Sequence, residues 1–313
     1  MKKIIVIATI ACLRALTACS DGNDPTLQPV AETTVCLEGA IGVSTRTVIG
    51  SGYEKDLAVC FARQDETTSG VYGTWSVCGA VRSGGSGNRP VLFEEAQLYP
   101  PDGSSIRMQG YYPAAGETDV ATGRAIFTID GMTDVMATDN LSGNGFVPLK
   151  TCTFYHLLSQ LGLVCYSDRA DRWGEIIRIE VAAVHTRQEL EWQSVSPVLA
   201  DASSGGDIKP ISVQEIDGLP LPQVEEGGEL PEAQGYVLLP ATSAPLQLHV
   251  TTTKDGNGNA VETLSRVSVT VEGGFLPGKR HVVSLFFTDG RKIQATTVGV
   301  ERWADQDAGE IPI

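Results

Sequence analysis

Residues 246–273, "LQLHVTTTKDGNGNAVETLSRVSVTVEG", carry the pattern that decides the fold. Apolar and polar residues alternate in both arms of this stretch, and β-branched residues are frequent, as in strands with one buried face. The apolar positions of the alternation are Leu246, Leu248 and Val250 in the first arm and Val267, Val269 and Val271 in the second. Between the arms, "KDGNGN" is rich in turn-forming residues. The stretch predicts a β-hairpin whose strands share an apolar face.

The same turn begins like a calcium-binding loop, with Asp255, Asn257 and Asn259 at alternate positions. Position six of such a loop is glycine and position twelve is a bidentate glutamate. This sequence has Ala260 and Arg266 there. We therefore predict a hairpin turn at this point and no metal site.

Strand-like runs continue outward from the hairpin in both directions. They are "DLAVCFA", "YGTWSVCGAV", "PVLFEEAQLY", "SIRMQGYY", "RAIFTID", "EIIRIEVAAV", "HVVSLFFTDG" and "KIQATTVGVERW". Only "TFYHLLSQLGL" fits helical spacing as well as a strand, and its length does not decide between them. The pattern predicts an all-β chain of two antiparallel β-sandwiches in series, with a linker near residues 166–175.

Composition narrows the class of partner. The 313-residue chain has a formal net charge of −15, and only 19% of its residues are charged. Such a chain is repelled by phosphate backbones, so we expect no nucleic-acid partner. Its 34 glycines and 16 prolines suit many short turns between strands.

The N-terminus has the features of an export signal. Lys2 and Lys3 precede the apolar stretch "IIVIATIACL", which is too short to span a bilayer. The stretch ends in "LTAC", which resembles the lipobox of bacterial lipoproteins and implies acylation of Cys19. We expect a signal peptide over residues 1–18 and an acidic tether over residues 19–32, so that lipid anchors the mature chain to a membrane. The alternative is an ordinary secretory signal with a coincidental cysteine.

Cysteine spacing gives no metal site. Beyond the signal and Cys19, the cysteines are Cys36, Cys60, Cys78, Cys152 and Cys165. Five is an odd number, and the spacings include no zinc pattern, so at least one thiol is unpaired in a monomer. Cys60 and Cys165 lie in apolar runs, which favours buried free thiols.

Catalytic patterns are missing from the sequence. The four histidines, which are His156, His185, His249 and His281, are scattered, and there is neither a nucleophile elbow nor a phosphate-binding loop. We therefore expect no enzyme activity, no catalytic residue and no cofactor. A second possibility is an aromatic platform for carbohydrate, for which a core role is preferred. Its candidate residues are Tyr111, Tyr112, Trp173 and Trp192.

Several motifs resemble one known family when read in order behind the lipobox. They are "STRTVIGSG", "FEEAQLYPPDGSSIRMQGYYPAAG", "TFYHLLSQLGLVCYSD" and "VSLFFTDGRKIQATTVGVERWAD". Together they are similar to the fimbrillin-like proteins, the type V pilins of Bacteroidales and their relatives. The resemblance covers most of residues 19–313.

The resemblance implies two tandem transthyretin-like antiparallel β-sandwich domains, over residues 33–168 and 169–313. It implies a lipoprotein at the outer membrane and cell surface that enters a pilus after maturation. A trypsin-like protease is expected to cut after Arg46 and free the first strand, Thr34–Val43. The residues to be released include Thr34, Val35, Cys36, Leu37, Ile41 and Val43. Other pilin subunits then become partners, because each supplies a strand to the opened groove.

Two features leave alternatives open. A disulfide from Cys36 would hold the first strand in place after cleavage, and Arg46 can equally be an ordinary surface arginine. The chain can therefore be a structural, tip or adhesive pilus subunit. Alternatively, it is a surface lipoprotein that does not polymerise and binds a glycan or host ligand.

Overall fold

The protein is nearly all-β. The computed structural model describes residues 33–42, 49–193, 196–202, 207–289 and 291–302. Within these residues, 22 strands and one four-residue helix make up the regular structure. The predicted all-β class is confirmed at this level. The predicted signal and tether, residues 1–32, lie outside the described residues.

Strands of the N-terminal half close into a ring. Its members are β1 (Leu37–Ile41), β2 (Leu57–Thr68), β4 (Ser76–Arg82), β5 (Arg89–Phe93), β6 (Ile106–Tyr112), β9 (Met136–Ala137) and β11 (Thr151–His156). The order is β6-β9-β11-β1-β5-β4-β2, and β2 pairs again with β6, so the sheet is barrel-like. Two short strands, β3 (Val71–Tyr72) and β10 (Leu141–Gly143), extend it from β2 and β6. The predicted β-sandwich is therefore not confirmed for this half, whose strands join in one closed sheet.

The C-terminal half contains two sheets. The first has the order β18 (Gly235–Pro240), β12 (Leu158–Ser167), β21 (Lys279–Phe287) and β22 (Ile293–Arg302). The second has the order β16 (Ile208–Ser212), β13 (Glu175–His185), β19 (Leu246–Thr252) and β20 (Thr263–Val269), and β17 (Leu219–Pro220) also pairs with β13. Buried residues of both sheets share one hydrophobic core. The predicted hairpin is β19 and β20, which pair from Leu246–Val269 to Thr252–Thr263.

The hairpin turn is held by its own side chains. Asp255 accepts hydrogen bonds from the backbone N–H groups of Asn257 and Asn259 and from the Asn259 side chain, and it is paired with Arg291. The Asn259 side-chain bond is the largest of the causes that lower the pKa of Asp255 to about 2. Internal donors therefore occupy the carboxylate, in agreement with a turn.

The change of sheet comes earlier than predicted. The run over residues 151–167 is divided at Leu157 into β11, which belongs to the ring, and β12, which pairs with β18 and β21. The predicted boundary at residue 168 lies after β12, whose two partner strands both come later in the chain. Helix α1 (Ala170–Trp173), in the predicted linker, connects two strands of the C-terminal half. The sequence gives no sign of this change of sheet. Nearly all residues of β12 are buried, so the strand has no alternation that would show which sheet it belongs to.

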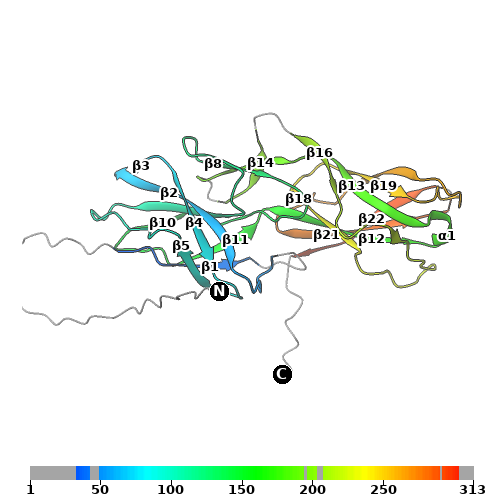
Figure 1. Ribbon diagram of the computed structural model, residues 1–313, viewed down its shortest axis with the longest axis horizontal. Coiled ribbons are helices and arrows are strands. Elements are labelled where there is room, and N and C mark those ends of the chain that lie inside the picture. The colour runs from blue at the N-terminus through cyan, green and yellow to red at the C-terminus, as the bar shows by residue number, and fades with distance from the viewer. Residues whose placement is uncertain (1–32, 43–48, 194–195, 203–206, 290, 303–313) are drawn as a thin grey trace, which may run out of the picture.

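A further sheet joins the two halves. It has the order β15 (Leu199–Asp201), β14 (Arg187–Glu191), β8 (Arg124–Thr128) and β7 (Glu117–Asp119). Strands β8 and β14 come from different halves and pair in an antiparallel manner. Figure 1 shows them side by side in an elongated molecule that has β2 and β5 toward one end and α1 at the other. We call this sheet the bridging sheet.

Trp192 follows the bridging sheet and enters the N-terminal half. Its ring is fully buried, lies edge-on to Trp75 at 5.4 Å and stacks on Tyr111 at 6.1 Å between centroids. Tyr111 and Trp173 are buried as well, whereas Tyr112 is half-buried. The preferred core role is thus confirmed for three of the four aromatic residues considered as a carbohydrate platform.

Candidate functional site

Strand β1 is an interior strand of the ring, although it comes first in the described chain. On one side it pairs with β5 in an antiparallel manner, with Leu37 opposite Val91. On the other side it pairs with β11, and this pairing is parallel, with Ile41 opposite Phe154. The predicted sandwich was antiparallel throughout, so this pairing and that of β12 with β21 depart from it. We call the space between β5 and β11 that β1 fills the β1 slot.

Backbone bonds hold β1 and the residues before it along their length. The Val35 N–H donates to the Gln97 carbonyl at 2.7 Å, and Thr34 forms an isolated bridge with Leu98. On the β11 side, the Glu38 N–H donates to the Lys150 carbonyl at 2.9 Å. Strand β1 is thus bonded as a central strand is, and its removal would expose the edges of both neighbours.

The inward side chains of this segment belong to the core of the ring. Val35, Leu37 and Ile41 are 3%, 3% and 5% exposed. They are packed with Phe154 and Val91 in the same hydrophobic cluster. Glu38 points the other way and is exposed, as the period of two requires.

Gly39 lies between the apolar side chains, where a Cβ atom would make tight contacts. A Cβ atom built on it would lie 3.2 Å from Val91 Cγ2, 3.3 Å from Phe154 Cε2 and 3.5 Å from Cys152 Sγ. Even a methyl group here would make Val91 and Phe154 give way by a few tenths of an ångström, and a larger side chain would displace them further.

Arg82 of β4 holds the backbone of β1 from inside the ring. Its Nε donates to the Gly39 carbonyl at 2.9 Å, and its terminal nitrogens donate to the carbonyls of Ser83, Gly85 and Gly87. The residue is fully buried. Burial is the main cause that lowers the pKa of its guanidinium, and the charge of Arg89 adds to the effect.

A buried pair meets the other end of β1. His156 Nδ1 contacts the carboxylate of Asp134, and its Nε2 lies 3.2 Å from the carbonyl of Gly42. Both side chains are almost wholly buried. A Cβ on Gly42 would lie 3.2 Å from the Phe154 carbonyl, so this position is also close-packed. The carbonyls of Gly39 and Gly42 are thus each approached by a basic side chain of the ring.

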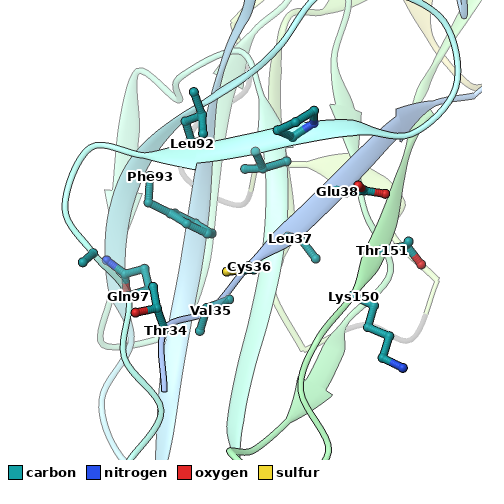
Figure 2. A pocket seen from close by; sticks show the side chains of 13 residues that line it. Thr34, Val35, Cys36, Leu37, Glu38, Leu92, Phe93, Gln97, Lys150 and Thr151 are labelled. Atoms are coloured by element: carbon teal, nitrogen blue, oxygen red, sulfur yellow. The ribbon is translucent and has the colours of Figure 1, made fainter. Parts of the chain in front are cut away.

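A depression of about 750 Å³ lies beside the N-terminal part of this segment. It is lined by residues of the segment, of β5 and its continuation, and of the start of β11, and Figure 2 shows Cys36, Phe93 and Gln97 around it. Cys36 is exposed and is a free thiol, as are the other four cysteines of the described residues. The disulfide considered for Cys36 is therefore not formed within the described part of the chain.

The other sequence-predicted site residues lie elsewhere. Val43 and Arg46 fall in the segment 43–48, and Cys19 precedes residue 33, so all three are outside the described residues. Sequence reasoning missed Arg82, His156 and Asp134. The one available signal was the motif F-x-H that contains His156, and that motif does not reveal what the side chain contacts.

Two further properties concern only the described residues. Among them, no group of three or more histidine, cysteine or acidic side chains is placed to hold a metal ion. No helix in the described ranges has the length and apolar character to cross a membrane.

Comparison with known proteins gives a fold but no sequence family. No family model matches the chain, and no curated protein matches it in sequence. Among solved structures, a candidate cell adhesion protein from Bacteroides uniformis aligns at 15% identity and a TM-score of 0.59, over 87% of this chain and 98% of that one. A candidate cell adhesion protein from Bacteroides ovatus aligns at 12% identity and a TM-score of 0.55, over 88% and 100%.

A third structure, a fimbrial assembly protein from Parabacteroides distasonis, aligns at 7% identity and a TM-score of 0.50, over 86% of this chain and 99% of that chain. The three proteins share the fold of this chain over nearly their whole length. Their names agree with the resemblance to fimbrillin-like proteins that the sequence motifs indicate.

Proposed function

We propose that this chain is a surface subunit of a fimbrial or adhesive fibre and that β1 is the strand exchanged during assembly. In this proposal each half corresponds to one transthyretin-like unit of the fimbrillin-like fold. A trypsin-like protease cuts after Arg46, the segment Thr34–Val43 leaves, and another subunit supplies a strand to the β1 slot. The fold that this chain shares with a cell adhesion protein and a fimbrial assembly protein supports a role in a fibre at the cell surface.

One observation carries the proposal: a strand at the start of the described chain occupies an interior position of a closed sheet. An edge strand could leave without exposing more than one neighbour. When β1 leaves, β5 and β11 both lose a partner, and a single incoming strand can satisfy both.

The energetics favour replacement over simple loss. Burial of one valine, leucine or isoleucine side chain is worth roughly 1.5–3 kcal/mol, so Val35, Leu37 and Ile41 together contribute on the order of 5–9 kcal/mol. Before cleavage, the intact chain keeps the strand at high effective concentration. After cleavage that advantage is lost, yet the slot remains costly to leave empty. A competing strand of similar chemistry is therefore needed to drive the exchange.

Limited trypsin digestion tests the proposal. The purified chain is digested briefly and examined by intact mass and size-exclusion chromatography. We expect a cut after Arg46 and species of higher mass. Arg46→Ala should abolish both changes and keep the protein monomeric. Lys55→Ala is the matched control, because it removes an exposed basic residue from the same connecting segment. It should behave as wild type.

A cut chain that keeps its first strand and stays monomeric would contradict the strand-exchange proposal. The alternative function, a surface binding module that does not polymerise, would then take precedence. Phe146 and Val147 favour a binding surface at the β10–β11 connection, since they are 76% and 70% exposed.

We also propose that acylation of Cys19 anchors the chain to the outer membrane. Cys19→Ala should abolish palmitate labelling and release the protein from membranes. Continued labelling of this variant would contradict the anchor without affecting the strand-exchange proposal.

A further inference from the structure

We propose that the β1 slot selects its occupant by a residue pattern: three large apolar anchors, with glycine two positions before the third. A strand from a second protein must carry this pattern to enter. The inference rests on the strand exchange proposed above and adds the chemistry of the partner strand. Strand β1 and the residue pair before it supply the template, with anchors at Val35, Leu37 and Ile41 and the glycine at Gly39.

The glycine position is tightly surrounded by three side chains. Val91, Cys152 and Phe154 lie 3.2–3.5 Å from a Cβ built on Gly39. The Phe154 ring is itself fully buried and packs edge-on against Phe61 of β2, at 6.0 Å between ring centroids, so its displacement would press on that neighbour. A valine here would add two more carbon atoms to a space that barely accepts one, and overpacking of this kind is destabilising.

The register of the occupant is fixed by the backbone as well as by the anchors. Arg82 binds the carbonyl of the glycine at 2.9 Å, and His156 Nε2 lies 3.2 Å from the carbonyl three residues later, that of Gly42. A slip of one residue would turn the anchors outward. A slip of two would bring Leu37 or Ile41 into the glycine position.

The neighbouring residue supplies a matched control. Ala40 lies on the opposite face of β1 and is half-buried, whereas Gly39 is inside. Ala40→Val therefore adds the same β-branched side chain to the same strand, but away from Val91 and Phe154. A general effect of bulk or of β propensity would affect both variants, and the slot would affect only Gly39→Val.

The test uses the full chain with residues 43–48 replaced by the recognition sequence of a site-specific protease. Cutting then depends neither on Arg46 nor on the natural protease. The probes are fluorescent peptides of residues 33–42 with Cys36→Ser, as the parent and with Gly39→Val or Ala40→Val added. Anisotropy reports peptide binding to the cut protein, and intact mass reports loss of the chain's own segment.

We expect the parent and Ala40→Val peptides to displace the strand with affinities within about threefold of each other. The Gly39→Val peptide should bind about 10-fold to 100-fold more weakly. If it instead binds within threefold of the parent, the selection rule is wrong, and strand exchange still stands.

If no peptide displaces the strand, the strand-exchange proposal fails, and supply of the strand by a partner fails with it. Amide exchange in the uncut chain then tests whether the β1 slot disfavours a side chain at position 39. Amide exchange over residues 35–42 should be at least about tenfold faster in Gly39→Val than in Ala40→Val. Equal exchange in the two variants would overturn the rule for the chain's own strand too.

Discussion

Replacement of Trp192 by alanine should separate the two halves of the molecule in their unfolding. The indole is fully buried and packs on Trp75 and Tyr111, which belong to the other half. Truncation of a buried tryptophan costs about 3–5 kcal/mol. Each aromatic pair adds about 0.5–1.5 kcal/mol beyond its area. We therefore expect Trp192→Ala to lower the free energy of unfolding by about 4–5 kcal/mol.

Trp173 is the matched control. It is equally buried, but it packs on Phe287 within the C-terminal half, and its Nε1 donates to the Thr288 carbonyl at 3.0 Å. Trp173→Ala should destabilise that half and leave the contact between halves intact. The Nε1 of Trp192 has no hydrogen-bond partner among the described residues. Trp192→Phe should therefore be milder than Trp173→Phe, which leaves the Thr288 carbonyl without its donor.

The assay is urea unfolding followed by circular dichroism, with amide exchange read separately for each half. Wild type and Trp173→Ala should unfold in one transition, whereas Trp192→Ala should unfold in two. A single transition for Trp192→Ala, with a loss below about 2 kcal/mol, would refute the reasoning, because the bridging sheet would then couple the halves without Trp192.

Three further outcomes follow from buried groups. Burial lowers the pKa of His281. Below pH ~6.5 the unfolded chain therefore binds more protons at this residue than the folded chain does. The urea midpoint of wild type should fall as the pH drops below that value, and the midpoint of His281→Gln should not. In the native protein, iodoacetamide should alkylate exposed Cys36 but not Cys165, since burial raises the pKa of the Cys165 thiol to about 12. Arg82→Met should cost about 1–3 kcal/mol and speed amide exchange around Gly39, because that carbonyl loses its buried donor; unchanged exchange there would contradict the role given to Arg82.

The sequence predicted features that depend on local periodicity. Leu248, Val250, Val267, Val269 and Val271 are buried, because an alternation of two identifies the inner face without knowledge of the partner strand. Ring closure and the parallel partner of β1 were not predictable in this way. They depend on pairing between segments far apart in the chain, which leaves no local pattern.

The slot itself shows the same limit. Gly39 reads as an ordinary strand glycine until the ring of Phe154, more than a hundred residues later, is known to lie against it. Arg82 precedes a glycine-rich turn and reads as a surface residue, yet the carbonyls around it make burial of its charge tolerable. The change of sheet at Leu157 leaves no mark in the sequence, because residues 151–161 contain neither glycine nor proline.

The bridging sheet has a consequence for how proteins of this shape can diversify. Modular proteins change by recombination, when one half is exchanged for that of a relative at a linker. Here β8 and β14 hydrogen-bond across the division, and the salt bridge between Arg124 and Glu191 spans the same pair of strands at 3.1 Å. Recombination at Leu157 would join the β8 of one protein to the β14 of another. The two strands would then no longer have evolved as a pair. The two halves are therefore expected to be inherited as one unit, and variation should concentrate in loops that neither strand touches.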